Sequence, residues 1–294
     1  GQFNRAEFEL PARPAHGRAD SIVFDRDGHL ELRHVEYTGC PAGRHDWMLH
    51  ATRIDIDQQA QQGVGRDVRL DFKGVPLFYL PIISFPVGDA RKSGFLFPTI
   101  GQSSRNGFEL SAPYYWNMAP NYDATLTPGL MSKRGATLGT EFRFLTTTSR
   151  GEFHDDWVPS DANANRDRTL LHFVERTDFS SRLRFDTNIA YASDSAYFQD
   201  FGLGPEATSV TFLTRLARLT YLDSHWRAIG LVEEFQTIDQ TVAAADRPYT
   251  RAPQIMVHGR WNEGSGPGFE MQAEAANFTR DTGVRGGRYG LEPM

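Results

Sequence analysis

The chain has 294 residues, a formal net charge of −6, and 12% aromatic residues. This length accommodates one large β domain or two ordinary domains, and the mild negative charge argues against a nucleic-acid-binding surface. No run approaches the roughly 18 apolar residues of a membrane-spanning helix, whereas a spanning β-strand needs only about 9–11 alternating residues. No charged-then-apolar leader stands at Gly1, so we expect a secretory signal to be absent or already removed.

The first 85 or so residues predict stacked β-layers. Ala19–Asp25 is echoed 32 positions later by Ala51–Asp57, and a turn and a second strand, Leu30–Tyr37 or Val68–Phe72, follow each copy. This pattern suits a jelly roll or β-solenoid, although an ordinary sandwich core would also explain it. We expect the apolar interior to consist of Ile22, Phe24, Leu30, Leu32, Ile54, Ile56 and Leu70.

An apolar run with three prolines follows, at Gly74–Pro86. Proline lacks a backbone N–H, so this run cannot form a regular helix or a central strand. We expect an extended, buried connector that the polar turn Gly88–Gly94 closes. The predicted domains are therefore residues 1–87 and 88–294.

From Phe95 onward, segments of about ten residues alternate in hydrophobicity, as in a transmembrane β-barrel. Charges of both signs on one face suit a wet lumen, and the apolar face suits lipid. The clearest segments are Tyr122–Leu130, Thr137–Leu145, Arg182–Tyr191 and Phe269–Phe278. Val210–Tyr221 and Trp226–Phe235 alternate poorly. The chain stops in the strand-like Arg288–Met294, so we expect an all-β chain that ends within an antiparallel barrel.

Few residues suggest catalysis or metal binding. His154–Asp156 places one histidine beside two carboxylates, a set that is more often solvated in a turn than a metal or acid–base site. No G-x-S-x-G, P-loop, dinucleotide-binding or H-E-x-x-H motif occurs. We therefore expect no catalytic residue, no metal and no cofactor. The single cysteine, Cys40, is a buried thiol, a free thiol, or half of a bridge to a distant partner.

Several unusual segments carry a family resemblance. These segments are Tyr37–Pro41 with Asp46 and Trp47, Gly74–Pro81, Ser84–Pro86, Asp89–Pro98, Pro113–Asp123, Met131–Gly135, Glu141–Leu145 and Ser193–Phe201. Together they resemble the lipopolysaccharide (LPS)-assembly protein LptD family, densely between residues 19 and 145 and more patchily afterwards.

The resemblance implies an outer-membrane protein whose N-terminal part is a periplasmic β-jelly roll. In the family, an apolar groove receives LPS from an LptA-type periplasmic bridge protein, an LptE-type lipoprotein plugs the barrel, and the lipid leaves sideways through a seam. The first barrel strands would be Phe95–Ser103 with Pro98, and Phe108–Trp116 with Pro113. Cys40 would be half of an interdomain disulfide.

Each of the two prolines removes a potential ladder hydrogen bond, worth about 1 kcal/mol net, and so weakens the seam as a lateral gate would require. Alternatively, Pro98 and Pro113 sit at strand ends and only shape turns. The resemblance predicts a non-enzymatic LPS transporter. An outer-membrane lipase or deacylase using His154, His172 or His258 is one alternative, and a passive porin is another.

Overall fold

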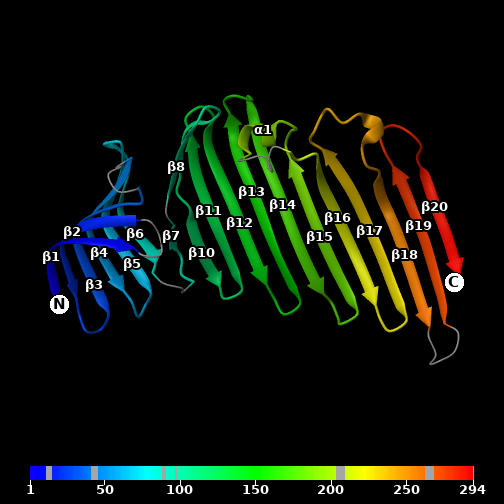
Figure 1. The fold of residues 1–294 in the computed structure, drawn as a ribbon, viewed down its shortest axis with the longest axis horizontal. Helices are drawn as coiled ribbons and strands as arrows, with labels where there is room; N and C mark the ends of the chain where they lie inside the picture. The colour runs from blue at the N-terminus through cyan, green and yellow to red at the C-terminus, as the bar shows by residue number, and fades with distance from the viewer. Residues whose placement is uncertain are drawn as a thin grey trace. The chain divides into compact units, whose positions relative to one another are not determined.

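The computed structural model describes residues 1–10, 15–40, 46–87, 91–96, 98–202, 209–261 and 268–293. In these ranges the chain is all-β and antiparallel, as predicted (Figure 1). The helical elements described are α1 (Tyr197–Phe201) and the 3-10 turn η1 (Ala244–Asp246). Within the described residues, no helix has the length and apolar character needed to cross a membrane.

Twenty strands are described. The first ten are β1 (Gln2–Leu10), β2 (Ala15–Phe24), β3 (His29–Thr38), β4 (Trp47–Asp57), β5 (Gln62–Phe72), β6 (Val75–Pro86), β7 (Gly94–Phe95), β8 (Thr99–Ser103), β9 (Gly107–Ser111) and β10 (Tyr114–Ala119). The others are β11 (Tyr122–Met131), β12 (Gly135–Leu145), β13 (Ser149–Asp161), β14 (Arg166–Asp178), β15 (Leu183–Ala192), β16 (Phe212–Leu222), β17 (Trp226–Thr237), β18 (Thr250–Trp261), β19 (Phe269–Thr279) and β20 (Gly286–Pro293).

The chain divides into two compact units. Unit 1 comprises Gly1–Phe97 and Pro113–Met118, and unit 2 comprises Pro98–Ala112 and Ala119–Met294. In unit 1, β1 to β6 form one sheet in sequence order, and β7 pairs with β10. The predicted jelly roll and the predicted domain boundary after residue 87 stay predictions.

The proline-rich run is a strand rather than the connector that the sequence predicted. Val75–Pro86 forms β6, the last strand of the six-stranded sheet. Proline is tolerated there because an edge strand needs no donor on its outer side. The expectation of burial was also wrong, because Val75, Tyr79 and Ile82 are each more than half exposed.

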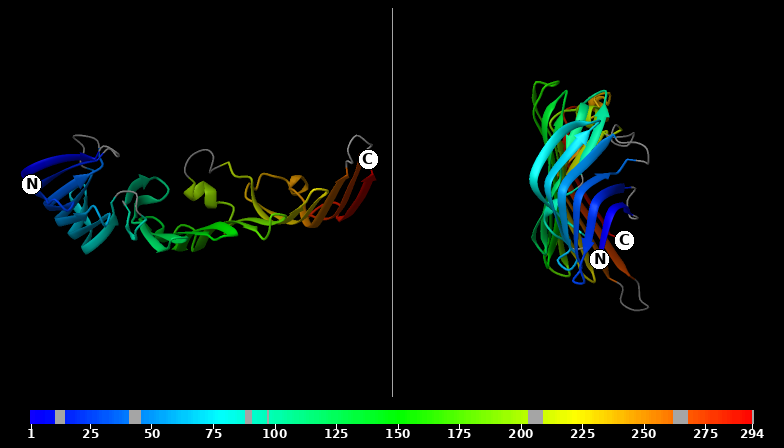
Figure 2. Two further views of the ribbon diagram at one scale, coloured as in Figure 1. Left: turned by 90° about the horizontal axis from the view of Figure 1, so that it is seen from below. Right: turned by 90° about the vertical axis from the view of Figure 1, so that its left-hand side faces the viewer.

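In unit 2, each strand from β11 to β20 pairs with its sequence neighbours, and β11 also pairs with β9, which pairs with β8. The two longest connections, residues 193–211 with α1 and residues 238–249 with η1, lie at the same end of the strands (Figure 1). Figure 2 shows α1 on one side of the sheet rather than beyond its edge. The sheet of unit 2 therefore has one face that a folded loop partly covers.

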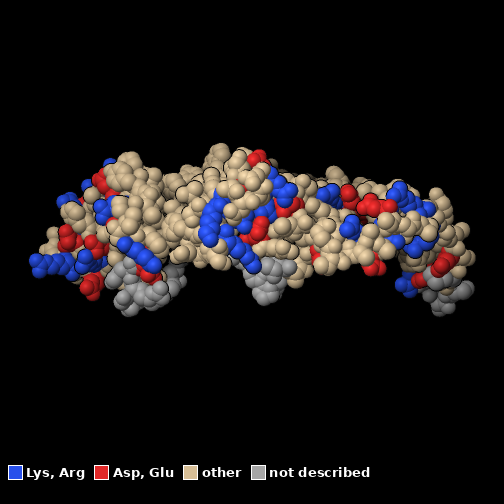
Figure 3. Space-filling model, turned by 90° about the horizontal axis from the view of Figure 1, so that it is seen from above, with Lys and Arg blue, Asp and Glu red and all other residues tan. Residues whose placement is uncertain are grey.

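The strand register places mainly apolar side chains on one face of this sheet and mainly polar side chains on the other. This confirms the alternation in hydrophobicity that the sequence predicted. One cross-strand row reads Ala124, Phe142, Phe153, Phe173 and Ile189. The adjacent row, on the other face, reads Thr125, Glu141, His154, His172 and Ala190. In Figure 3 acidic and basic side chains lie interspersed rather than in separate patches.

The two poorly alternating segments are nevertheless strands, β16 and β17. Their pattern is irregular because Arg215 of β16 and Glu234 of β17, which are opposite one another, continue the apolar row of Ile189. The Arg215 guanidinium lies 3.5 Å from the Glu234 carboxylate and 5.3 Å from the centre of the Tyr191 ring, so an ion pair and a cation–π contact accommodate its charge.

Candidate functional site

The seven predicted groove residues lie on one face of the six-stranded sheet. Ile22, Leu32 and Ile54 are directly opposite one another on β2, β3 and β4. Phe24, Leu30 and Ile56 form the next row on that face. Ile22, Leu30, Ile54 and Ile56 are partly buried against one cluster whose buried members are Ala19, Leu32, Val35, Ala51 and Val68.

The two remaining candidates differ in burial. Leu70 is fully buried and faces Leu49. Phe24 is 43% exposed and stacks on Phe3, with 5.7 Å between ring centres. Phe24 therefore lies where this apolar face meets solvent.

A crease runs across all six strands of this sheet, and the sequence analysis did not find it. Ala19 and Ile22 are three residues apart, yet both face the apolar cluster, as do Leu32 and Val35 on β3. In a regular strand, residues three apart point to opposite faces. Each strand therefore carries one extra residue between the two inward rows, and the sheet bends there.

Backbone conformation marks the same crease. Arg5, His34 and Asp67, on alternate strands, have positive φ values of 55°, 47° and 50°. Non-glycine residues rarely adopt this region, so the bend is local and specific. The internal echo has a structural meaning here, because Ala19 and Ala51 flank the same residue of β3. A spacing of three between small or apolar residues was the signal available in the sequence.

A carboxylate is held at the crease. Asp67 accepts hydrogen bonds from the Tyr79 hydroxyl at 2.6 Å and the Thr52 hydroxyl at 2.8 Å. The Tyr79 bond, then the Thr52 bond, lowers the pKa of Asp67, and its carboxylate raises the pKa of Tyr79. These contacts tie β4, β5 and β6 together at the bend.

Both predicted seam prolines lie at breaks in strands. The strand predicted at Phe95–Ser103 is divided into β7 and β8, and Pro98 immediately precedes β8. The one predicted at Phe108–Trp116 is divided into β9 and β10, with Pro113 between them. The compact units also divide at these two prolines.

Among the described residues, the ladder pairs on either side of the breaks are Phe95 with Tyr114, and Thr99 with Ser111. The Leu96 N–H donates to the Pro113 carbonyl at 2.8 Å. The proline positions themselves have no N–H to contribute.

Cys40 is buried and forms no disulfide with any described residue. Its backbone N–H donates to the Thr38 hydroxyl at 3.1 Å, and that hydroxyl donates to the Trp47 carbonyl at 2.7 Å. A bridge to a partner elsewhere in a longer chain stays a prediction.

His154 contacts a carboxylate that the set His154–Asp156 does not include. Asp155 lies on the opposite face, because adjacent strand residues alternate. On its own face His154 contacts Glu152 and lies opposite Glu141, and the three side chains could hold a metal ion. The Arg143 guanidinium lies 3.3 Å from Glu141 and already compensates that carboxylate.

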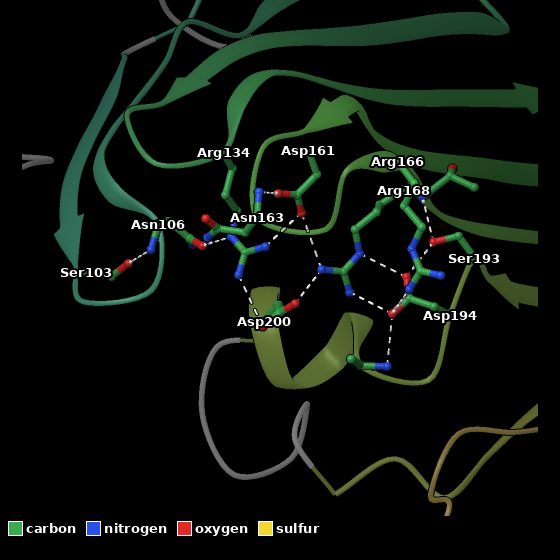
Figure 4. A network of polar contacts seen from close by, with 12 residues as sticks. Ser103, Asn106, Arg134, Asp161, Asn163, Arg166, Arg168, Ser193, Asp194 and Asp200 are labelled. Atoms are coloured by element: carbon green, nitrogen blue, oxygen red, sulfur yellow. Dashed lines mark hydrogen bonds and ion pairs between the residues drawn. The ribbon is translucent and has the colours of Figure 1, made fainter.

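A buried ion cluster, which the sequence analysis missed, lies beside α1 (Figure 4). Arg134, Asp161 and Arg168 are exposed by only 3%, 0% and 1%. Arg134 donates to Asp161 at 2.7 Å, and Arg168 donates to Asp194 at 2.8 and 2.9 Å. Asp200 of α1 contacts both guanidinium groups.

Aromatic side chains of α1 cover these charges. The Phe201 ring centre lies 4.6 Å from the guanidinium carbon of Arg134 and 4.9 Å from that of Arg168. Tyr197 and Phe201 also join the apolar cluster that packs α1 onto Leu170, Ala190 and Ala192. These last three residues belong to the polar-row face, so α1 is folded against that face.

Two family models match the chain. One, described as LPS transport system D, covers residues 166–294, and the other, described as LptD protein, covers residues 64–190. The two matches overlap and together reach from residue 64 to residue 294.

Curated relatives agree with the models. The LPS-assembly protein LptD of Bordetella pertussis is 36% identical over 281 residues, which is 95% of this chain and 36% of the relative. The Nitrosospira multiformis protein of the same name is 36% identical over 304 residues, covering 100% of this chain and 32% of the relative. That of Nitrosococcus oceani is 37% identical over 286 residues, covering 96% and 38%.

The chain thus spans about a third of the length of these relatives. A solved outer membrane channel, DcaP of Acinetobacter baumannii, aligns over 90% of this chain and 83% of its own at a TM-score of 0.31 and 10% identity, too weak a likeness to carry an argument. Both family models and the curated relatives name one family: this chain belongs to the LptD family.

Proposed function

We propose that the complete protein transports and assembles LPS at the outer membrane. Unit 1 would lie in the periplasm and hold acyl chains against its apolar face. Unit 2 would form part of the wall of a transmembrane barrel, with its apolar rows toward lipid. The observation that carries this proposal is the continuous apolar face of the creased sheet in a member of the LptD family.

The apolar face has the chemistry that acyl chains need. Burying each CH₂ group is worth about 0.8 kcal/mol, so several chains bind strongly without any charged contact. Phe24, at the exposed margin of this face, is a natural first contact for an incoming lipid. An LptA-type bridge protein would deliver the lipid to this unit, and an LptE-type lipoprotein would occupy the barrel interior.

The exit would be the strand pair broken at Pro98 and Pro113. In lipid, an unpaired backbone group is costly, so a ladder that already lacks donors opens at lower cost than an intact one. The single cysteine, Cys40, would pair with a cysteine outside this chain.

The hydrolase alternative gains no support from the three histidines considered for it. Within the part of the chain that the structure describes, their side-chain partners are Glu152 for His154, Asn188 for His172, and Glu270 for His258, and no serine is among them. We therefore propose a transporter without catalytic activity of its own.

Photocrosslinking in living cells tests the route. A photoreactive residue at Phe24 should form LPS adducts, whereas one at the neighbouring Val23, which is also exposed but on the opposite face, should not. A third probe at Thr99, beside Pro98, should also form adducts. Equal labelling at Phe24 and Val23, or none at any position in folded protein, would rule out this route.

The proline breaks are tested separately. Replacing Pro98 and Pro113 together by Ala restores two donors, each worth about 1 kcal/mol, and should slow the appearance of new LPS at the cell surface. Pro120→Ala, the same change at a turn residue outside the breaks, is the control. Unchanged export in the double variant would leave the prolines as turn-formers only.

A further inference from the structure

The turn of the β8–β9 hairpin, near Asn106, is hydrogen-bonded to the turn between β11 and β12. The Lys133 N–H donates to the Asn106 carbonyl at 3.1 Å, and Lys133 Nζ donates to the Ser104 carbonyl at 2.8 Å. The Phe108 N–H donates to the Ser132 hydroxyl at 2.9 Å. This end of the hairpin is therefore held firmly, in contrast to the proline break at its other end.

The two turns also pack tightly. Gly107 has a φ of +78°, and an added Cβ would lie 2.2 Å from Ser132 Oγ. A side chain at this position would be strained in its backbone conformation and would displace the Ser132 hydroxyl. The position of the hairpin end thus depends on the position of the turn that contains Ser132, Lys133 and Arg134.

Arg134 joins this fastened end to the buried cluster. Its Nε donates to Asn106 Oδ1 at 2.7 Å, Nη1 donates to Asp161 at 2.7 Å, and Nη2 lies 3.1 Å from Asp200 of α1 (Figure 4). One planar guanidinium therefore contacts the hairpin, the end of β13 and the loop helix. A guanidinium satisfied on three sides has little freedom to move independently of its partners.

Asp200 is the link to α1 because it contacts both buried guanidinium groups. Without it, Arg134 and Arg168 would face fewer carboxylates, and an uncompensated buried charge is strongly unfavourable. Displacement of α1 would therefore disturb Arg134, and with it the bond to Asn106.

We propose that Arg134 is a positioning residue for the β8–β9 hairpin, and that Asp200 makes the hairpin's position depend on α1 staying folded against the sheet. The proposal deepens the function proposed above, because this hairpin belongs to the suggested exit. While α1 is in place, the exit would open at the proline break and stay fixed at the Asn106 end. Removal of α1 would free that end as well.

Hydrogen exchange in the complete, membrane-assembled protein tests the coupling. Asp200→Asn changes α1 without touching the hairpin, and it should speed exchange of the Lys133 and Phe108 amides by about tenfold. Asp178→Asn, which breaks the exposed Asp178–Arg184 pair at the other end of β14, should leave both amides unchanged. Faster exchange in α1 alone would overturn the proposal.

A second variant covers failure of Asp200→Asn to fold. Asn106→Ala removes the hairpin's acceptor for Arg134, and it should speed exchange at Lys133 and Phe108 while α1 stays protected. Arg134→Lys, which retains the charge but not the three-sided contact, should resemble Asn106→Ala rather than the parent. Parental exchange in both variants would refute the positioning role.

The coupling and the proposed function fail separately. Coupled exchange without LPS adducts at Thr99 would leave the positioning role standing and remove the transport route. LPS adducts at Thr99 with uncoupled exchange would support the transport route and remove the positioning role.

Discussion

Asp194 shows how a buried carboxylate is kept charged in the loop after β15. Its side chain is 8% exposed, and it accepts bonds from Arg168, from the Ser193 hydroxyl at 2.9 Å and from the Ala196 N–H at 3.0 Å. Burial alone would raise the pKa of Asp194, but the bonds from Arg168 and then Ser193 outweigh burial and lower it. The folded state thus favours the ionised form.

This lowered pKa predicts a pH-dependent contribution to stability. The contribution is complete above the ordinary carboxyl pKa of about 3.9 and is lost as the pH falls through the lower folded-state value. At neutral pH, Asp194→Asn should cost about 1.5–3 kcal/mol, the range for bonds to charged groups. The midpoint of heat-induced unfolding of the complete protein, followed from neutral to acidic pH, measures the difference.

The parent and Asp194→Asn curves should converge on the acidic side, because protonation removes from the parent what the substitution already removed. A midpoint difference that stays constant with pH would show that the substitution disturbs packing rather than charge.

Sequence patterns could identify the apolar residues but not this cluster. Ile22, Leu32 and Ile54 were predictable because alternation is a local pattern along each strand. The charged cluster combines Arg134, Asp161 and Arg168 with Asp194 and Asp200, from turns, strands and a helix that only the sheet register brings together. Arg134, Asp194 and Asp200 did lie in segments that resemble the family, but the contacts between them could not be read from those segments.

At the scale of elements, the crease determines the form of the six-stranded sheet. Strict alternation would place Ala19 and Ile22 on opposite faces, whereas the bend puts both in one apolar cluster. Left-handed backbone at Arg5, His34 and Asp67 is how alternate strands accommodate the extra residue. The sequence predicted strands in the regions of β2 to β5 but not the bend, because none of these positions is a glycine.

His34 provides the test of the crease. Its side chain is exposed, so substitutions there act mainly through the backbone. His34→Gly should leave the stability of unit 1 unchanged or slightly improved, whereas His34→Val should destabilise it by about 1–2 kcal/mol, because a β-branched residue resists positive φ. Hydrogen exchange of β3 in the complete protein reports the local free energy.

The neighbouring Arg33 is the matched control, since it is exposed and lies in paired, extended backbone. Arg33→Val should change the local free energy by less than about 0.5 kcal/mol. Equal effects at residues 33 and 34 would mean that the left-handed conformation at His34 carries no strain.

At the scale of the whole molecule, the register of unit 2 assigns each residue to one of two environments. Leu219 and Leu216 are the same residue type on β16, but Leu219 lies opposite Phe185 and Gly230, while Leu216 lies opposite Asn188 and Glu233. Composition cannot distinguish these leucines, and β16 alternates too poorly for the sequence alone to show which face each occupies. Their partners on the neighbouring strands assign each leucine to a face.

If unit 2 is part of a membrane-spanning barrel, the two leucines should respond differently to a charge. Leu219→Arg would place a guanidinium in lipid near the middle of the strand, at a cost of about 2–4 kcal/mol, whereas Leu216→Arg would point into a polar interior beside Glu233. Folding yield and heat-resistant mobility of the complete protein in outer membranes measure both variants. A loss confined to Leu219→Arg would support the barrel wall. Equal tolerance would place both faces of this sheet in water, and a greater loss in Leu216→Arg would reverse the assignment of lumen and lipid faces.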